Sequence, residues 1–424
     1  MKLVCALKDH PFTENNGLGV ILYGYADRQT RGSAGAAIVE AIRKQHMLPA
    51  HRAWDFLSLA LSVTSADLAG ARDESPDGWT RQFELTVSVM DPEFWNSQRQ
   101  LIARLLGFLT TDLWDISFIG GGFCPEPPKD PVYTGEACVL LLSGGLDSFI
   151  GAVDLTAKQV RPLAVSQTVR GDAENQRAFA HLLGGGLRHL QLNHNTEIPN
   201  PENPPSQRAR SLIFIAEGIL AATSLKAYSD GAEIILYMAE NGFISINPPL
   251  TGARLGSLST RTTHPVFLQI LQGLLDAAGI RVRIVNPYQF KTKGEMLREC
   301  LEQNVAHEYA HATTSCGRFK KYGYKHCGRC VPCLVRRASF LAAGYDDKTV
   351  YVYNELGRDE DNHAGFDDVR SVAMALAESK DMGLDSWIGT ALSTALLGDI
   401  SAYQNTVDRG LQELGILFDL HGVK

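Results

Sequence analysis

The sequence predicts an α/β protein whose main domain is a doubly wound parallel sheet. From about residue 136, strand-like runs such as ACVLLL (137–142) alternate with helical runs such as SFIGAVDLTAK (148–158). This repeated β–α order favours a parallel sheet covered by helices. A glycine- and proline-rich linker at 120–131 separates this domain from a region of different rhythm. Ligands of such sheets bind at the carboxyl ends of the strands.

The first region, residues 1–130, predicts an α+β domain. GVILYGY (19–25) is strand-like, and an apolar helix is expected near 55–69. In QFELTVSV (82–89) every second residue is apolar, which indicates a half-buried strand. A helix with one apolar face follows at 101–109. No catalytic constellation is found there, so we expect this domain to dock a partner.

The domain boundaries follow from composition. GGGFCPEPPKDP (120–131) holds three glycines and four prolines, which break any regular element. We therefore expect the main domain to span 131–345. The last region, 346–424, contains a charged loop (357–365) and then helical runs, which predict a helical tail for packing or for oligomer contacts.

Composition excludes several classes of protein. The chain has 424 residues, is 45% hydrophobic and carries a formal charge of −7. That charge argues against nucleic acid as a partner, although a local basic groove remains open. No apolar run is long enough to span a membrane, and the amino terminus lacks the features of a secretory signal. We expect a cytoplasmic protein without a membrane partner.

The segment Ser143-Gly144-Gly145-Leu146-Asp147-Ser148 joins a strand to a helix. Free amides and the positive dipole end of the helix make such a junction an anion site, and glycine lets the backbone approach a ligand closely. A carboxylate there suits a Mg²⁺ ion that bridges phosphate oxygens. The alternative is an ordinary tight turn with a serine cap.

Four of the eight cysteines are crowded, with the spacing Cys316-x10-Cys327-x2-Cys330-x2-Cys333. Four thiolates can complete a tetrahedral structural Zn²⁺ site, and an iron–sulfur cluster is the competing interpretation. We expect the neighbouring His326 to be a bystander. The lysines and arginines of this segment either line a polyphosphate entrance or form a solvated face.

The SGGLDS segment resembles the PP-loop of N-type ATP pyrophosphatases, which have an adenine nucleotide alpha hydrolase-like fold. Combined with the cysteine spacing, residues 137–345 resemble QueC, the 7-cyano-7-deazaguanine synthase family. The resemblance implies adenylation of 7-carboxy-7-deazaguanine by ATP, then reaction with ammonia to an amide and a nitrile.

The stretch at 240–265 resembles the QueC-like proteins of anti-phage defence operons, most closely those of the QatC type from Qat systems. For these relatives the implied activity is an ATP-dependent, AMP-forming C–N ligase. It couples a 7-deazaguanine carboxylate to the N-terminal amine of a partner protein encoded nearby. The regions 1–130 and 346–424, which plain QueC enzymes lack, favour this interpretation because a protein substrate needs docking surface.

Three other functions remain open at this point. A nitrile synthase acting on 7-carboxy-7-deazaguanine with ammonia is the main alternative. A PP-loop enzyme that modifies tRNA is the second, although the acidic charge argues against it. An inactive scaffold is the third, and the intact SGGLDS segment argues against it.

The resemblance assigns ATP pyrophosphate and Mg²⁺ to Ser143, Gly144, Gly145, Leu146, Asp147 and Ser148. It places Ser166 beside adenosine, although Ser166 is also a candidate helix cap. Arg208 or Arg210 could neutralise the leaving pyrophosphate or form surface salt bridges. Lys293 could reach ATP phosphate or be a solvated lysine.

The substrate residues are predicted from their chemistry. Glu240 could accept hydrogen bonds from the N1–H and amine of a guanine-like ring, while Asn241 could read its carbonyl. Glu240 could instead be a buried structural carboxylate. Arg261 suits the substrate carboxylate, and His264 could act as a general base or be structural. Asp147, Lys293 and Arg261 are the candidate catalytic residues.

Overall fold

The computed structural model describes residues 1–13, 17–27, 29–168, 170–201, 209–252, 261–357, 368–392, 396–397 and 400–423. Within these ranges the chain forms two five-stranded sheets, and the paired strands of both sheets are parallel. No helix in the described ranges is both long and apolar enough to cross a membrane. The α/β class predicted from the sequence is confirmed.

The first sheet has the strand order β3-β2-β1-β4-β5. Its strands are β1 (Lys2–Ala6), β2 (Leu18–Leu22), β3 (Gly32–Ala34), β4 (Gln82–Ser88) and β5 (Leu113–Ile119). Its helices are α1 (Ala36–Lys44), α2 (His51–Ala69), α3 (Pro92–Ser97) and α4 (Arg99–Thr110).

The parallel pairing of this sheet corrects the α+β prediction for the first region. The alternation within β4 is real: Phe83 and Leu85 are buried while Gln82 and Glu84 are exposed. Alternation shows that only one face of a strand is covered, but it carries no information about the direction of the neighbouring strand. For that reason the one-sided strand was compatible with either pairing.

The second sheet has the order β10-β9-β6-β7-β8. Its strands are β6 (Cys138–Leu141), β7 (Leu163–Gln167), β8 (His189–Leu192), β9 (Ile234–Tyr237) and β10 (Val282–Val285). The chain moves outward from β6 to β8 and then returns to the other side of β6 with β9. The strand order therefore reverses between β6 and β9, where open α/β sheets bind ligands.

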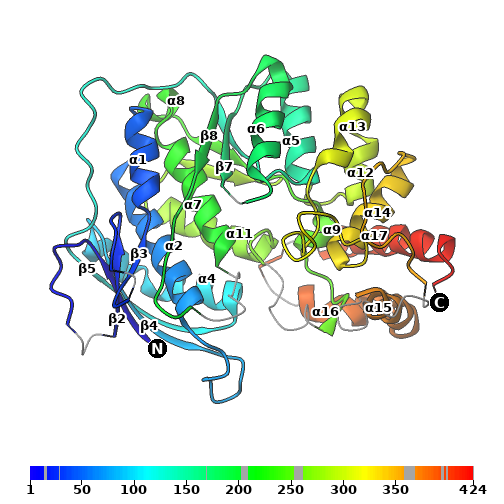
Figure 1. Cartoon of the computed structure of the whole chain (residues 1–424), viewed down its shortest axis with the longest axis horizontal. Coiled ribbons are helices and arrows are strands. Elements are labelled where there is room, and N and C mark those ends of the chain that lie inside the picture. Colours follow the sequence, from blue (N-terminus) through cyan, green and yellow to red (C-terminus); the bar gives the residue numbers. More distant parts are fainter. Residues whose placement is uncertain are drawn as a thin grey trace.

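Helices surround the second sheet, and a helical region follows it (Figure 1). The former are α5 (Leu146–Ala157), α6 (Ala173–Leu182), α7 (Arg210–Ala222), α8 (Lys226–Ser229), α9 (Gly242–Ser245), α11 (Pro265–Ala277), α12 (Lys293–Arg298), α13 (Gln303–Tyr309) and α14 (Val331–Ala343), with 3₁₀ turns at Leu183–Gly185 and Ala310–Ala312. The helical region holds α15 (Asp368–Met382), α16 (Leu384–Leu392) and α17 (Ile400–Leu420). Residues 358–365 of the predicted charged loop at 357–365 lie outside the described residues.

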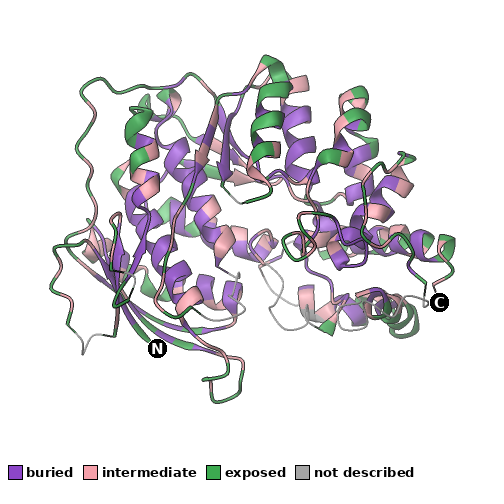
Figure 2. Cartoon of the chain, in the orientation of Figure 1, coloured by how far each residue is buried: buried purple, intermediate pink, exposed green. Residues whose placement is uncertain are grey.

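Helices α2 and α7 lie between the two sheets. Helix α2 packs on β4 and on α7, and α7 packs on β6 and β7. All residues of α2 from Ala53 to Asp67 are buried. Figure 2 shows much of the interior of the molecule in the colour for buried residues. A helix covered on all sides is expected to be apolar all round, and the buried serines of α2 return their hydroxyls to carbonyls one turn earlier.

A buried ionic network joins the two halves of this core. Arg81 contacts Asp67 Oδ1 at 2.6 Å and Asp112 Oδ2 at 2.7 Å. The other carboxylate oxygen of Asp67 accepts a hydrogen bond from the amide of Ala209 at the start of α7. Helix α2 therefore fixes the first turn of α7.

In residues 120–137, all of which the structure describes, no helix or strand forms. This segment runs along the outside of the molecule from β5 to β6 (Figure 1). Two contacts hold it in place. The Val132 amide donates a hydrogen bond to the carbonyl of His46, and Thr134 forms an isolated β-bridge with Leu225.

Candidate active site

The SGGLDS segment is the turn between β6 and α5, as the sequence predicts. Gly144 has φ of 87°, a conformation that side chains with Cβ rarely adopt. Gly145 is the N-cap of α5, so the next main-chain amides lack partners within the helix. The hydroxyls of Ser143 and Ser148 lie 2.9 Å apart, and that of Ser148 also accepts from the amide of Ser143. The turn fits an anion of phosphate type.

Asp147 is the centre of a buried polar cluster at this turn. Its Oδ1 accepts from Lys293 Nζ, and its Oδ2 accepts from Asn241 Nδ2 at 2.7 Å and from the Asn241 amide at 3.1 Å. Burial pushes the pKa of Asp147 upward, but the charge of Lys293 and the hydrogen bonds outweigh it and hold that pKa below its usual range. Asp147 therefore stays ionised.

Lys293 is buried, which contradicts the alternative that it is a solvated surface lysine. It is the first residue of α12, whose N-cap is Thr292. The Thr292 hydroxyl accepts from the Glu295 amide, and the Glu295 carboxylate accepts from the Thr292 amide. This capping box sets the start of α12 at the residue that meets Asp147.

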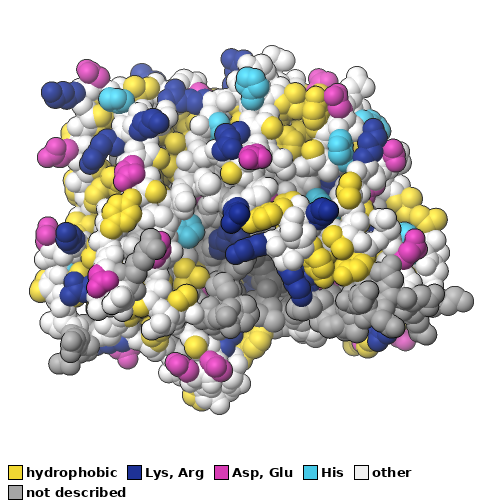
Figure 3. Space-filling view, viewed as in Figure 1, with side chains coloured by type: hydrophobic (Ala, Val, Ile, Leu, Met, Phe, Trp, Pro, Cys, Tyr) yellow, Lys and Arg dark blue, Asp and Glu magenta, His cyan; other side chains and the backbone are white. Residues whose placement is uncertain are grey.

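A cavity of about 230 Å³ opens at this cluster. The carboxylates among its lining residues are Asp147 and Glu240, and Lys293 supplies a positive charge. An ionised carboxylate beside phosphate-binding amides fits Mg²⁺, for which Asp147 and Glu240 would be the oxygen ligands. Figure 3 shows several Lys and Arg side chains near the middle of the face viewed.

A second cavity, of about 180 Å³, shares Ser143, Ser148, Ala239 and Glu240 with the first. Its remaining walls are largely apolar and come from the first turns of α7, the ends of β6 and β9, and the segment before α11: Leu141, Ser211, Phe214, Ile215, Met238, Thr262 and Thr263. Together the two cavities reach the size range of small-molecule sites, about 300–1,000 Å³.

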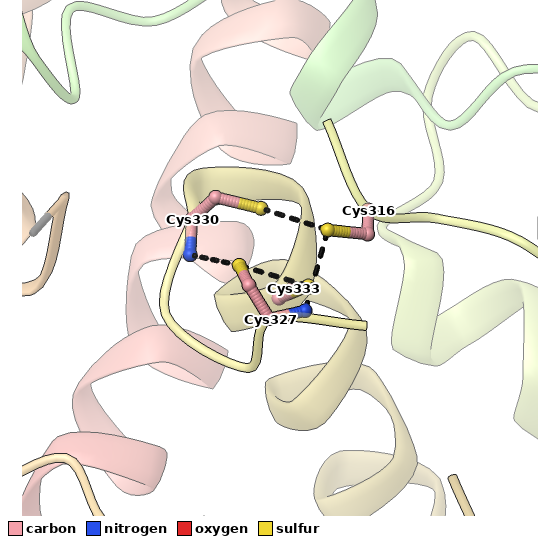
Figure 4. A group of neighbouring side chains, drawn as sticks. All are labelled: Cys316, Cys327, Cys330 and Cys333. Carbon is pink, nitrogen blue, oxygen red and sulfur yellow. Dashed lines mark hydrogen bonds between the residues drawn. The ribbon is translucent and has the colours of Figure 1, made fainter. Parts of the chain in front are cut away.

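The four crowded cysteines converge, as their spacing predicts. Their sulfur atoms all lie within 4.8 Å of one another and point toward a common centre (Figure 4). The sulfur atoms of Cys316 and Cys330 are 3.9 Å apart, and so are those of Cys327 and Cys333. Zinc–sulfur bonds of about 2.3 Å in a tetrahedral shell place sulfur atoms about 3.8 Å apart. The cluster therefore fits a closed structural zinc site.

The cysteine segment also forms a wall of the first cavity. Thr314, Ser315, Pro332 and Val335 line it, and the Thr314 amide donates to the carbonyl of Gly144. None of these four residues is predicted from the sequence. Only their adjacency to Cys316 and Cys333 could have indicated them.

The basic residues of this segment include structural anchors. Arg336 is buried and donates to Thr313, Ser315 and Thr349 and to two carbonyls. Arg329 is also buried and donates to the carbonyl of Glu355. The prediction that these basic residues form a solvated face is therefore wrong for Arg329 and Arg336. His326 accepts from the Ser315 amide and lies outside the cysteine group, as expected of a bystander.

Three predicted site residues point elsewhere. The Ser166 hydroxyl donates to the carbonyl of Leu142 and contacts His189, inside the sheet. The guanidinium of Arg261 lies over the ring of Phe108 and donates a hydrogen bond to the main-chain carbonyl of Phe108. His264 caps α11 through the Val266 amide, and burial lowers its pKa to about 4. None of the three is among the residues that line the two cavities.

The other predicted residues are placed as follows. Glu240 lines both cavities. The Asn241 side chain is engaged by Asp147, Glu240 and the Ile244 amide. Arg210 donates to Gln167. Arg208 and residues 253–260 of the stretch at 240–265 lie outside the described residues.

Comparison with known proteins gives the same family as the sequence resemblance. Residues 262–344 match the profile of the family described as queuosine biosynthesis protein QueC. A 7-cyano-7-deazaguanine synthase from Paracoccus denitrificans is 36% identical over 92 residues, which cover 21% of this chain and 36% of that protein. One from Brucella canis is 29% identical over 156 residues, covering 37% of this chain and 54% of that protein.

One from Methanocaldococcus jannaschii is 35% identical over 74 residues, covering 17% of this chain and 32% of that protein. The matches span between about a third and about half of these three relatives. No solved structure matches the chain at a significant level. The chain is thus related, at modest identity, to the QueC family and to 7-cyano-7-deazaguanine synthases.

Proposed function

We propose that this protein is an AMP-forming enzyme that activates a 7-deazaguanine carboxylate with ATP, and that ammonia is the acceptor, so that the product is 7-cyano-7-deazaguanine. One observation carries the proposal. The SGGLDS turn, Lys293 and the wall of the cysteine segment surround a single cavity at the strand-order reversal. The relatives named 7-cyano-7-deazaguanine synthase support the choice of substrate.

The proposed chemistry assigns one task to each part of the cavity. The amides of the turn and Lys293 would bind the β- and γ-phosphates of ATP, with Mg²⁺ held by Asp147 and Glu240. The substrate carboxylate attacks the α-phosphorus and expels pyrophosphate. Ammonia then displaces AMP from the acyl carbon and loses a proton, which leaves an amide. The amide oxygen then attacks the α-phosphorus of a second ATP and expels pyrophosphate. Departure of that oxygen with AMP, together with loss of both protons from the nitrogen, gives the nitrile.

The second cavity suits a flat heterocycle, either the adenine of ATP or the 7-deazaguanine of the substrate. Phe214, Ile215 and Met238 offer apolar contact to a flat ring. Thr262 has a buried hydroxyl oxygen without a hydrogen-bond partner among the described residues, so it is available to a polar ring edge. A ring in this position would lie next to Ser143 and Glu240, which line both cavities.

The direct test is incubation of the purified chain with 7-carboxy-7-deazaguanine, ammonium, Mg²⁺ and ATP. Mass spectrometry should show the amide and then the nitrile, with AMP formed in step. Asp147→Asn is the matched inactive control. ATP turnover to AMP without any deazaguanine product would contradict the assigned substrate, and no AMP with any acceptor would contradict the reaction class.

A protein amine is the second candidate acceptor, which would make the enzyme a ligase of the type found in anti-phage defence operons. The observation that favours it is the extent of chain outside the family match. The first sheet and helices α15–α17 lie outside residues 262–344 and pack onto the main domain. Intact mass spectrometry of neighbouring gene products, co-expressed with the chain or with Asp147→Asn, should then show an ATP-dependent mass increase. Unmodified partners beside active nitrile formation would exclude the ligase.

A further inference from the structure

Helix α17 contacts both segments that place side chains on Asp147. One is the start of α12, which carries Lys293, and the other is the start of α9, which follows Asn241. Helix α17 packs on α9 and on α14. It spans Ile400–Leu420 and therefore lies beyond residue 344, where the family match ends.

Glu413 of α17 reaches the turn that carries Lys293. Its Oε1 accepts a hydrogen bond from the hydroxyl of Thr292, and its carboxylate lies beside the main chain of Gly294. The fit at Gly294 is close, because a Cβ there would lie 2.5 Å from Glu413 Oε1 and would displace that carboxylate. Glu413 thus contacts the residues immediately before and after Lys293.

Arg409, one turn earlier on α17, holds the same segment from the other end. Its Nε donates to Glu295 Oε1 at 2.6 Å, and its Nη2 donates to the carbonyl of Phe290 at 2.8 Å. Glu295 is also the residue that completes the capping box of α12. Two charged side chains from α17 therefore bracket residues 290–295.

The second segment is held by close packing. A Cβ at Gly410 would lie 2.3 Å from the ring of Phe243, in the first turn of α9. Thr406 of α17 also lies close to Gly242, because a Cβ added at Gly242 would be 3.0 Å from the Thr406 methyl group. Asn241, the N-cap of α9, is thereby kept where its amide meets Asp147.

We propose that Glu413 and Arg409 are positioning residues that hold Lys293 against Asp147, so that helix α17 is a required part of the active site. Helix α12 has only six residues, so its own hydrogen bonds fix its first turn weakly. Helix α14 packs along α12, and the contacts from α17 add a constraint at the start of α12. A shift of the ammonium group by about 1 Å is enough to cost up to about a hundredfold in rate.

The proposal rests on the proposed function for its kinetic test. Glu413→Ala removes the acceptor for the Thr292 hydroxyl and the contact with Gly294, while Glu413→Gln retains an acceptor oxygen. We expect kcat for AMP formation to fall between about tenfold and a hundredfold in Glu413→Ala, with KM for ATP changed far less, and to be largely rescued in Glu413→Gln. Gln412→Ala is the matched control, because Gln412 is exposed on the same helix and donates to Asp408, away from α12.

Hydrogen exchange provides a readout that needs no turnover. The amides of Gly294 and Glu295 should exchange faster in Glu413→Ala than in the wild type or in Gln412→Ala. Unchanged exchange at both amides, in a variant that keeps its thermal midpoint, would overturn the positioning role. Absence of AMP formation by the wild type would instead overturn the proposed function, and hydrogen exchange alone would then decide whether α17 holds the start of α12.

Discussion

Lys293 donates a hydrogen bond to Asp147 across 146 positions of sequence. Both side chains are less than a tenth exposed. The contact joins the phosphate-type turn after β6 to the first residue of α12, so the charge at the cavity depends on two distant segments. Because the pair is buried, the loss of one member leaves the other charge without its ion-pair partner.

Removing either member of this pair should cost both stability and activity. We expect Lys293→Met to lower the free energy of unfolding by about 3–5 kcal/mol, because Asp147 is left buried and unpaired. AMP formation should fall at least about a hundredfold. Urea unfolding and an AMP assay measure the two effects. If the destabilisation in the double variant Asp147→Asn/Lys293→Met equalled the sum of the two single effects, the pair would not be coupled.

Acid should unfold the protein partly through Asp147. The pKa of Asp147 is depressed in the folded chain, so its stabilising contribution is present above the unfolded value of about 3.9 and is lost as pH falls toward the folded value. As pH falls below about 4, thermal midpoints should therefore decline less steeply in Asp147→Asn than in the wild type. Parallel curves would contradict this assignment.

Glu413 should give the opposite pH dependence. Burial raises its pKa to about 7, and Glu295 adds to the rise, whereas Thr292, Gly294 and Arg298 oppose it. The contribution of a raised carboxyl pKa is complete below the unfolded value of about 4.3 and is lost as pH rises through about 7. Glu413→Gln should flatten the stability profile in this window. An unchanged slope would show that the carboxyl titrates normally.

Zinc should be bound at one ion per chain and should support the cavity wall. Cys330→Ser should release the metal, lower the thermal midpoint and weaken ATP binding, because Thr314 and Ser315 border both the cluster and the cavity. Metal analysis, thermal unfolding and calorimetry test these effects. Cys124→Ser, an exposed position outside the cluster, is the control. A metal-free wild type, or iron in place of zinc, would contradict the assignment.

Gly144→Ala should weaken ATP binding through the backbone. The nearest atom to the new Cβ would be 3.4 Å away, so the strain comes from the positive φ and amounts to about 1–2 kcal/mol. Gly273→Ala, inside α11 with open space around it, should be neutral or stabilising by about 0.5–1 kcal/mol. Equal ATP affinity in both variants would show that the turn does not bind phosphate.

The features that could be predicted from sequence are local. The SGGLDS turn and the four cysteines are short segments whose spacing determines their geometry, and the β–α order determines where the strand ends meet. The helical start at Lys293 also follows from the capping pattern of Thr292 and Glu295. Their roles in catalysis stay predictions.

Features that depend on contacts between distant segments could not be predicted. Arg261 and His264 are typical ligand-binding residues by type, but packing against Phe108 directs them away from the two cavities. The parallel direction of the first sheet and the contacts of Glu413 depend on residues far apart in the chain. No periodic pattern in one segment encodes which distant segment will face it.

The α2–α7 layer limits how this chain can be divided. Cutting the chain at the exposed linker (120–137) would leave each half with a long apolar helix facing water. The start of α7 would also lose its hydrogen bond to Asp67, the carboxylate that Arg81 holds in place. Expression of either half alone should therefore give aggregates, although the linker looks like a natural cutting point. We therefore expect the two sheets to fold as a single unit, in which substitutions in one half are constrained by the other.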